Sequence, residues 1–393
     1  MYPERFSHLP EYAFPRFRAL LDGHDFAGPQ FNMTIGEPQH RYPAWIKDVL
    51  LEQIDGFNRY PANDGIEKLQ VSIVKWFYRR FGLELTPDKN IVPVNGTREG
   101  LYNVSMALCP ESLNCKAPFV LIPNPFYQVY MISALSVNAE PLFIPTDENG
   151  GHLPDYFSLT ADILNNTSAA YICSPSNPQG AVATVEYITA LIELAEKYDF
   201  IIFADECYSE IYRDQAPVGA LEALNTIEAD PERLVVFHSL SKRSNLPGLR
   251  SGFLATGPEN LKRLSQLKSY GGAPLPKPLQ YAAAAVWKDE QHVKENRKLY
   301  AAKYKIADDI LSGLDGYTSP EAGFFLWIKV EDSEKTCLNL WRETGVRVLP
   351  GAYLAQEKNG KNPGQNFIRV ALVAEQKITE EALTKIRSFL EKQ

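Results

Sequence analysis

The sequence lacks the features that mark several large classes of protein. No stretch of its 393 residues approaches the roughly 18 uninterrupted apolar residues of a membrane-spanning helix. It has no run of five or six basic residues and a net charge of −8, so we expect no nucleic-acid partner. Residues 1–17 lack the apolar core of a secretory signal, which predicts a cytoplasmic protein.

Thiols and metal ligands are also too few or too scattered to build a site. The five cysteines form no Cys-x-x-Cys pair, and their odd number predicts free thiols rather than a disulfide framework. The six histidines form no His-Glu-x-x-His motif, so we expect no metal site built by the protein alone. With 45% apolar and 22% charged residues, the composition is that of a soluble globular protein.

The middle of the chain repeats a pattern of a short apolar run, a turn and a helical segment. Several runs are apolar from end to end, which is typical of strands that helices cover on both faces. Residues 66–81 and 185–198 have apolar positions at helical spacing. The alternation predicts an α/β fold with a doubly wound, mostly parallel sheet of seven strands. The predicted strands are residues 91–94, 118–122, 140–144, 169–173, 200–204, 234–238 and 252–256.

Both ends of the chain depart from this pattern. Residues 1–30 mix aromatic, proline and charged residues, which indicates an extended arm with one helical turn. APLPKPLQ (273–280) interrupts the alternation, and a long helical stretch at about 277–313 follows it. We therefore predict a large domain of residues 31–289 and a smaller α+β domain built from residues 1–30 and 290–393.

Polar motifs follow the predicted strands, at the sheet edge where α/β folds bind ligands. NGTREG (95–100) offers backbone N–H groups to an anion, although an ordinary strand–helix turn has the same character. SPSNPQG (174–180) carries Asn177 and is also consistent with a plain loop. DECYSEIY (205–212) sets Asp205 at a strand end; the alternative is a helix N-cap followed by core tyrosines.

SLSKRSNLPGLRSGF (239–253) places Lys242 and Arg250 between two apolar runs that look like buried strands. A buried lysine has a depressed pKa and can attack carbonyl groups, whereas a lysine that extends to solvent is the structural alternative. We expect both cations to be buried, Lys242 as a nucleophile and Arg250 as the partner of a phosphate.

Together these motifs supply what pyridoxal 5′-phosphate chemistry requires: a lysine, an acid for the pyridine nitrogen, donors for the phenolic oxygen and an anion cradle. In order and spacing the chain resembles the fold-type I pyridoxal-phosphate aminotransferases of class I/II, the aspartate-aminotransferase superfamily. The resemblance runs from about Thr34 to the C-terminal helices. Further motifs that carry it are TIGEP (34–38), NRYPANDGIEKLQ (58–70), PNPFYQVY (123–130) and FIRVAL (367–372).

The resemblance implies a role for each residue that matches a family motif. Lys242 would form the Schiff base with the cofactor and, once the substrate releases it, move the proton at the substrate Cα. Asp205 would pair with the pyridinium nitrogen. Asn177 and Tyr208 would hydrogen-bond the phenolic oxygen, and Tyr127 would stack on the cofactor ring.

Other matches concern the phosphate, the substrate and a second subunit. Arg369 matches the arginine that binds the substrate α-carboxylate. Gly36 lies in a loop over the substrate, and Asn177 is also expected to contact the substrate. Tyr60 matches a residue that reaches the phosphate of the neighbouring subunit, which implies a homodimer with shared active sites. The positions that match the phosphate site are Gly96, Thr97, Arg98, Ser239, Ser241 and Arg250.

Within the superfamily, the motifs resemble those of bacterial N-succinyl-L,L-diaminopimelate aminotransferases of lysine biosynthesis. This implies transfer of an amino group from N-succinyl-L,L-2,6-diaminopimelate to 2-oxoglutarate, which gives N-succinyl-2-amino-6-oxopimelate and glutamate. The succinyl carboxylate would need a second cationic patch, for which Arg243, Arg41 and Lys268 are candidates, each equally consistent with a surface role.

Three alternatives stay open at this point. One is another class I/II aminotransferase, acting on aspartate, aromatic amino acids, kynurenine or alanine. The second is a β-lyase that uses the same cofactor, since it would share Asp205, Tyr208 and Lys242. The third is a transcriptional regulator built on an aminotransferase domain, which the start of the motifs near residue 34 disfavours because it leaves no room for a DNA-binding module.

Overall fold

The computed structural model of the protein describes residues 4–7, 9–146 and 148–393. Residues 1–3 and 8, in the predicted smaller domain, and residue 147, in the predicted large domain, lie outside this description. The strands are β1 (Phe31–Asn32), β2 (Ile91–Val94), β3 (Phe119–Asn124), β4 (Glu140–Pro145), β5 (Thr167–Cys173), β6 (Ile201–Asp205), β7 (Leu234–Ser239), β8 (Gly252–Thr256), β9 (Phe325–Lys329), β10 (Val346–Arg347), β11 (Leu349–Pro350) and β12 (Phe367–Ala371).

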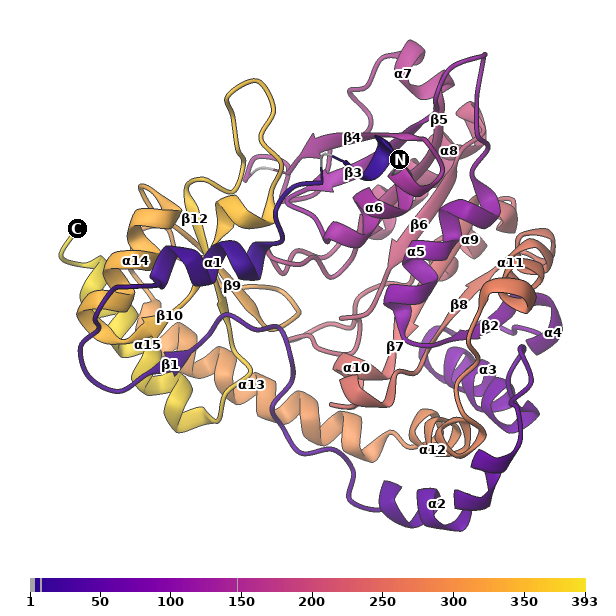
Figure 1. Ribbon diagram of the computed structural model, residues 1–393, viewed down its shortest axis with the longest axis horizontal. Helices are drawn as coiled ribbons and strands as arrows, with labels where there is room; N and C mark the ends of the chain where they lie inside the picture. Colours follow the sequence, from indigo (N-terminus) through magenta and orange to yellow (C-terminus); the bar gives the residue numbers. More distant parts are fainter. Residues whose placement is uncertain (1–3, 8, 147) are drawn as a thin grey trace.

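The α-helices complete the two regions that Figure 1 shows, one around the large sheet and one around the C-terminal strands. They are α1 (Ala13–Leu21), α2 (Ile46–Glu52), α3 (Glu67–Phe81), α4 (Pro87–Asn90), α5 (Thr97–Leu108), α6 (Gln128–Ser136), α7 (Ala161–Asn165), α8 (Val185–Tyr198), α9 (Ala220–Thr226), α10 (Leu240–Arg243), α11 (Pro258–Gly271), α12 (Lys277–Lys288), α13 (Gln291–Leu311), α14 (Ser333–Thr344) and α15 (Gln376–Leu390).

Seven strands form one sheet in the order β2-β8-β7-β6-β5-β3-β4. Strand β8 is antiparallel to its neighbours β2 and β7, whereas the other neighbouring pairs are parallel. The predicted seven-stranded, mostly parallel sheet is therefore confirmed. Because only β8 is reversed, the carboxyl ends of the other six strands and the start of β8 meet at one edge, and every predicted polar motif lies there.

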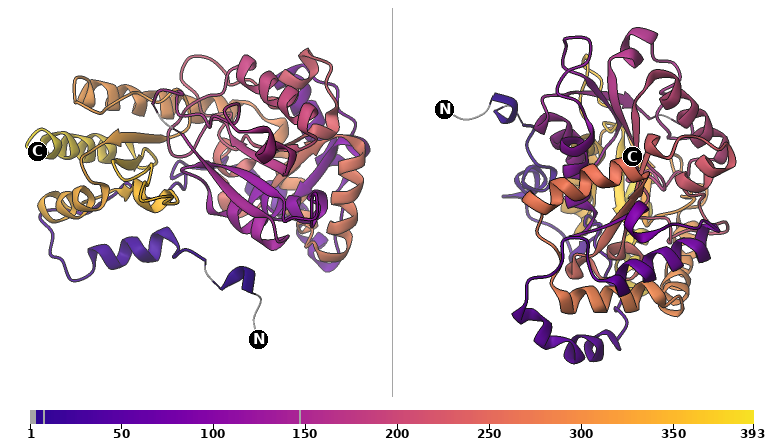
Figure 2. Two further views of the ribbon diagram at one scale, coloured as in Figure 1. Left: turned by 90° about the horizontal axis from the view of Figure 1, so that it is seen from above. Right: turned by 90° about the vertical axis from the view of Figure 1, so that its right-hand side faces the viewer.

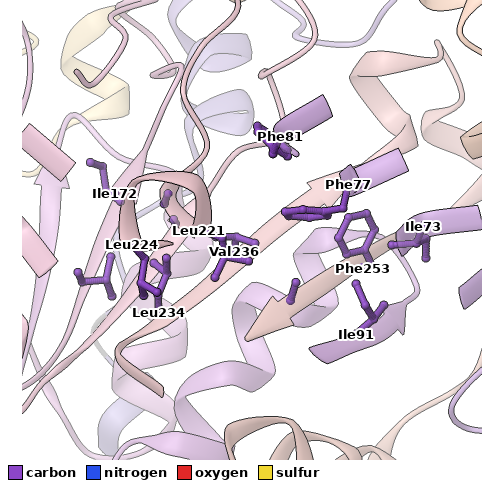
Figure 3. Packing of buried hydrophobic residues seen from close by; sticks show 14 of the residues in the cluster. Ile73, Phe77, Phe81, Ile91, Ile172, Leu221, Leu224, Leu234, Val236 and Phe253 are labelled. Carbon is purple, nitrogen blue, oxygen red and sulfur yellow. The ribbon is translucent and has the colours of Figure 1, made fainter. Parts of the chain in front are cut away.

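Helices cover both faces of this sheet, because successive strand residues point to opposite sides. Phe253 belongs to a buried cluster with residues of α3, α8, α9 and α12, whereas the next residue, Leu254, belongs to one with residues of α5, α6 and α11. Figure 3 shows the first cluster, in which Ile73 and Phe77 of α3 lie beside Phe253 and Ile91 of the sheet. Burial on both faces explains why the strands are apolar from end to end.

The predicted helices at residues 66–81 and 185–198 are confirmed as α3 and α8. The helical stretch predicted at about 277–313 is confirmed and consists of two helices, α12 and α13, because the chain breaks at residues 289 and 290. Asp289 has an extended backbone, and its Oδ2 accepts the backbone N–H of His292 at 3.0 Å. A carboxylate that caps the first turn of a new helix thus ends the previous one.

The C-terminal strands form a second, antiparallel sheet in the order β11-β12-β9. The N-terminal segment packs here, because β1 pairs in parallel with β10, and Phe17 and Leu21 of α1 pack against Trp341 of α14. Figure 2 shows α1 beside the C-terminal helices. The arm predicted to hold one helical turn contains the nine-residue α1; Pro15 obscured this helix, although proline is tolerated in a first turn.

The division into a large domain of residues 31–289 and a smaller one of 1–30 and 290–393 stays a prediction. The pairing of Phe31 with Val346 and the backbone bond from Ala371 N–H to the Met33 carbonyl favour placing its first boundary after Met33. Helix α13 begins at Gln291 and runs from α12 into the C-terminal region (Figure 1). Across the described residues no helix combines the length and apolarity of a bilayer span.

Candidate active site

A cavity of about 540 Å³ opens at the sheet edge where the strand ends meet. Residues after β2, β3, β5, β6 and β7 form its floor, and residues of α1, β9 and β12 form the opposite wall. It therefore lies between the large sheet and the C-terminal region. The predicted site residues that line it are Gly36, Thr97, Arg98, Tyr127, Asn177, Asp205, Tyr208, Ser239, Ser241, Lys242, Arg250 and Arg369.

Lys242 extends from the one-turn helix α10, directly after β7. Its Nζ donates a hydrogen bond to the Gly36 carbonyl and lies 5.9 Å from the centre of the Tyr208 ring and 5.4 Å from that of Phe324. Burial lowers the pKa of Lys242 to about 8, because the charged form loses its hydration. A neutral amine is therefore available near physiological pH, and such an amine can attack a carbonyl carbon.

Asp205 ends β6 and is buried at the floor of the cavity. Its Oδ2 accepts a hydrogen bond from the Tyr130 hydroxyl at 2.7 Å, and its Oδ1 accepts the backbone N–H of Cys207 at 3.2 Å. Burial raises the pKa of this carboxyl, because neither donor carries a charge that would replace the lost hydration. A cationic N–H group that entered the cavity would relieve this penalty.

The start of α5, two serines and an arginine form an anion cradle. Gly96 precedes α5 with φ +76°, and a Cβ at this position would collide with the guanidinium of Arg250, so glycine permits their approach. Ser239 and Ser241 lie across from them, with their hydroxyls 2.9 Å apart. Helix N–H groups, hydroxyls and a guanidinium are the donors that phosphate prefers.

Arg250 is exposed, whereas we predicted it to be buried. It lies in the connection before β8, directly after the short 3₁₀-helix Pro247–Leu249, and has a left-handed backbone with φ 55°. Its Nη1 donates to the Pro247 carbonyl at 2.7 Å and its Nη2 to the Asn95 carbonyl at 3.3 Å. These bonds hold the guanidinium at the rim of the cavity, where it can serve an anion without lying in the core.

Arg369 projects from β12 into the cavity and is buried. Its Nη1 donates to Asn177 Oδ1 at 3.0 Å, its Nη2 donates to the Thr34 carbonyl at 2.7 Å, and the guanidinium lies 4.3 Å from the Phe325 ring centre. Burial lowers its pKa to about 10, so it still carries its charge at neutral pH. Its buried Nε has no partner among the described residues, which leaves a donor for an entering carboxylate.

Tyr127 and Tyr60 occupy very different places. Tyr127 lines the cavity, and its hydroxyl accepts a hydrogen bond from Arg98 Nε at 2.7 Å. Tyr60 lies outside the cavity with a fully exposed side chain, so this chain does not bring it to its own site. The resemblance assigns Tyr60 to the site of a second chain, and that role stays a prediction.

The three residues considered for a second cationic patch lie outside the cavity lining. Arg243 is 2% exposed, and its Nη2 pairs with Glu290 at 2.6 Å. Lys268 is buried and donates to the Pro93 carbonyl, and Arg41 is exposed. Neighbouring residues of a helix point about 100° apart, so Lys242 and Arg243 on α10 face different sides.

The cavity also contains residues that the motifs did not single out. Tyr130 donates a hydrogen bond to Asp205 and lies three residues after Tyr127 in the motif PNPFYQVY (123–130). Because residues three apart share one face of a helix, this spacing could have indicated that Tyr130 faces the same cavity as Tyr127. Tyr12, Phe14 and Phe325 come from segments without any motif. Only the tertiary arrangement of the C-terminal region, against which α1 packs and to which β9 belongs, brings them to the site.

The chain matches the model of the family aminotransferase class I and II over residues 28–386, and it belongs to this family. It is thus a pyridoxal-phosphate-dependent aminotransferase with the aspartate-aminotransferase-like fold. The LL-diaminopimelate aminotransferase of Dehalococcoides mccartyi is 28% identical over 98% of both chains, and that of Moorella thermoacetica is 28% identical over 99% of this chain and 98% of its own.

Two solved structures are similar along the whole chain. An aminotransferase from Neisseria meningitidis Z2491 has a TM-score of 0.93 and 36% identity, and it covers 98% of this chain and 99% of its own. The aminotransferase AspB from Helicobacter pylori 26695 has a TM-score of 0.91 and 32% identity, with 98% and 100% covered. Both likenesses extend beyond the sheet to the C-terminal region that closes the cavity.

The residues present fit pyridoxal phosphate. The cradle at Gly96 suits its phosphate, the buried Asp205 suits a protonated ring nitrogen, and Lys242 supplies an amine for its aldehyde. When bound, this cofactor supplies an aromatic ring that accepts the electron pair left at the substrate Cα. Arg369 would hold the carboxylate attached to that carbon.

The pKa of Lys242 predicts how the apoenzyme captures its cofactor. A protonated amine has no lone pair, so the rate of covalent capture is expected to rise about tenfold per pH unit below pH 8 and to level off above it. Stopped-flow absorbance of apoenzyme mixed with pyridoxal phosphate at several pH values measures this rate. A plateau that began only above about pH 10, the ordinary range of lysine, would show that burial does not lower the pKa.

Proposed function

We propose that this aminotransferase transfers the amino group of N-succinyl-L,L-2,6-diaminopimelate to 2-oxoglutarate, a step of lysine biosynthesis in the cytoplasm. The observation that carries the proposal is a pair of cationic side chains that line one cavity, the buried Arg369 and the exposed Arg98. This pair suits a long substrate with a carboxylate at each end. The resemblance of the Lys242 and Asn177 motifs to the succinyl-substrate group adds to this support.

The chain's own residues divide the chemical work. Lys242, freed when the substrate amine takes its place, holds and moves the proton at the substrate Cα. Asp205 keeps the ring nitrogen protonated. Asn177 Oδ1 is occupied by Arg369, so its amide Nδ2 is left to donate toward the cofactor, beside the Tyr208 hydroxyl. Asn177 therefore links the carboxylate-binding arginine to the cofactor.

Arg98 is the cation that these roles leave unassigned. Lys242, Arg250 and Arg369 suit the aldehyde, the phosphate and the α-carboxylate, whereas Arg98 makes no ion pair within the described residues. Its hydrogen bond to the Tyr127 hydroxyl and the proximity of Tyr12 raise its pKa. We assign its side chain to the succinyl carboxylate rather than to the phosphate that the resemblance implies.

Replacing Arg98 by alanine should weaken the binding of the succinylated substrate selectively. A charge-assisted hydrogen bond contributes about 1.5–3 kcal/mol, so we expect KM for N-succinyl-L,L-diaminopimelate to rise roughly 10- to 150-fold with a small change in kcat. The half-reaction with L-alanine, which has no distal carboxylate, should keep its rate. An equal loss for both substrates would place Arg98 at the cofactor instead, as the resemblance implies.

L,L-diaminopimelate itself is the second candidate substrate. The relatives in Dehalococcoides mccartyi and Moorella thermoacetica bear the name LL-diaminopimelate aminotransferase, and the carboxylate of Glu37 lines the same cavity. A free distal ammonium would need such a carboxylate, whereas the succinylated amine would not. The negative charge of Glu37 therefore favours L,L-diaminopimelate, which has a distal ammonium group, over the succinylated substrate, in which that nitrogen is uncharged.

Half-reactions on the purified holoenzyme test the proposal. Each amino donor is added without an acceptor, and the loss of the visible absorbance of the Lys242-bound cofactor is followed. A fast reaction with N-succinyl-L,L-diaminopimelate alone supports the proposal, and one with L,L-diaminopimelate alone supports the second candidate. Reaction with aspartate, aromatic amino acids, kynurenine or alanine in preference to both overturns them in favour of another aminotransferase, and release of ammonia from cystathionine identifies a β-lyase.

We also propose a homodimer in which Tyr60 reaches the partner's phosphate. Tyr60 is fully exposed in the single chain, and Leu51, Ile54 and Phe57 nearby in the sequence are exposed apolar side chains. Clustered exposed apolar residues indicate an interaction surface. Light scattering should therefore give twice the mass of one chain, and the change Tyr60→Phe should weaken cofactor binding without changing that mass. A monomer that retains its cofactor would contradict this prediction.

A further inference from the structure

The turn that carries Lys242 is capped by a side chain from a distant helix. α10 is a single turn, so the carbonyls of Lys242 and Arg243 at its end lack the partners that a longer helix would supply. Asn296 of α13, which is 4% exposed, places its Nδ2 at 3.4 Å from both carbonyl oxygens. In Figure 1, α10 lies beside the start of α13.

The other end of the Asn296 amide binds His40. Because Nδ2 faces two carbonyls, which only accept hydrogen bonds, Oδ1 is the acceptor, and it receives Asn245 Nδ2 at 3.0 Å. His40 Nδ1 lies 2.8 Å from the same Oδ1 and must therefore carry the ring proton. Burial and, next, the charge of Lys303 lower the pKa of His40, so the ring is neutral at neutral pH.

These contacts close a ring around Lys242. His40 lies four residues after Gly36, whose carbonyl accepts the hydrogen bond from Lys242 Nζ. The backbone carbonyl of Lys242 is held by Asn296, and its amine is held by the loop that His40 fastens to Asn296. Both ends of the lysine are thus connected to Asn296 of α13, the backbone directly and the amine through the loop that carries His40. Neither Asn296 nor His40 lines the cavity.

We infer that Asn296 and His40 are positioning residues that set where the Lys242 amine stands over the substrate Cα. Proton transfer depends steeply on the geometry of the groups, and a displacement of about 1 Å can reduce the rate by roughly 100-fold. Because the pair lies behind the cavity wall, its loss should affect kcat rather than KM. This inference rests on the role proposed for Lys242.

The experiment compares holoenzymes of the variants N296A, H40A, H40N and N260A. H40A removes the N–H donor. H40N keeps a donor near the same position, because asparagine Nδ2, like histidine Nδ1, is bonded to the γ-carbon. Asn260 of α11 is the matched control: it is also buried, and its Nδ2 donates to the Glu232 carbonyl at 2.7 Å, away from the cavity. For each variant, kcat, KM, the thermal midpoint and a pH titration of the visible absorbance of the Lys242-bound cofactor are measured.

N296A and H40A are expected to lower kcat by roughly 10- to 100-fold, to leave KM within about twofold, and to shift the midpoint of the absorbance titration. H40N should recover most of the loss, and N260A should lower only the thermal midpoint. The inference is overturned if N296A and H40A behave like N260A, or if they raise KM at unchanged kcat. Should N296A fail to fold, H40A and H40N decide the outcome alone, and equal kcat values for wild type and H40A would overturn it.

The variant K242A separates this inference from the proposed role of the lysine. If K242A keeps the visible absorbance or transaminates, the role of Lys242 is wrong. If K242A loses both while H40A and N296A keep wild-type kcat and titration midpoints, only the positioning role of the pair is wrong.

Discussion

The substitution Lys242→Ala should reduce transamination by about 10⁴-fold, the upper end of what a positioned proton-transfer group contributes. Among the described residues that line the cavity, Lys242 is the single lysine, and its amine donates to the Gly36 carbonyl and lies 5.9 Å from the Tyr208 ring centre. Its loss removes both the covalent attachment of the cofactor and the base for the substrate Cα. Single-turnover absorbance measurements with a large excess of amino donor give the residual rate.

The matched control is Lys268→Met. Lys268 is also a buried lysine, but it donates to the Pro93 carbonyl outside the active-site cavity. We expect K268M to lose stability and to keep both the visible absorbance of its cofactor and its rate per folded molecule. A K242A protein that retained even a tenth of the wild-type rate would show that another group moves the proton.

The second large effect is expected for Arg369. Removing one partner of a buried, hydrogen-bonded ion pair costs about 2–5 kcal/mol, so R369A should reduce kcat/KM by roughly 30- to 5,000-fold. The reduction should be similar for every α-amino acid, because Arg369 would bind the carboxylate that they share. In addition, R369A leaves Asn177 and the Thr34 carbonyl without their donor.

Three comparisons make the Arg369 prediction specific. R369K keeps the charge but not the planar fork, so it should recover only a small part of kcat/KM. R387A, on the half-exposed face of α15, removes bonds to the Ile310 carbonyl and Glu391 and should change stability alone. If R369A lowered kcat/KM only for the succinylated substrate and not for L-alanine, Arg369 would not bind the α-carboxylate. The roles of Arg369 and Arg98 would then be exchanged.

The local features of the sequence predicted the large sheet and much of the cavity floor. Strands covered on both faces are apolar at every position, so they stand out without knowledge of their neighbours. The polar residues at or after their C-terminal ends, such as Asp205 and Asn177, then had to meet at one edge because parallel strands share a direction. Thus the motifs around Lys242 could be placed together before the structure was known.

Orientation within short turns could not be read in this way. Lys242 and Arg243 are adjacent, but a single helical turn directs one to the cavity and the other to Glu290. Arg250 itself has a left-handed backbone conformation, which leaves its side chain at the rim instead of in the core. The break before α13 depended on one capping residue, Asp289, within an otherwise continuous helical pattern.

The sequence by itself determined the class of fold, the order of the strands along the chain and the group of residues suited to pyridoxal phosphate, because each depends on contacts or patterns within a few residues. The tertiary structure alone decided which side chains complete the cavity and which hold Lys242 in place. Tyr12, directly before α1, and Phe325 of β9 line the cavity, and Asn296 of α13 bonds the Lys242 carbonyl; these contacts join residues far apart in the chain. Such contacts follow from the packing of whole elements, which short sequence motifs do not record.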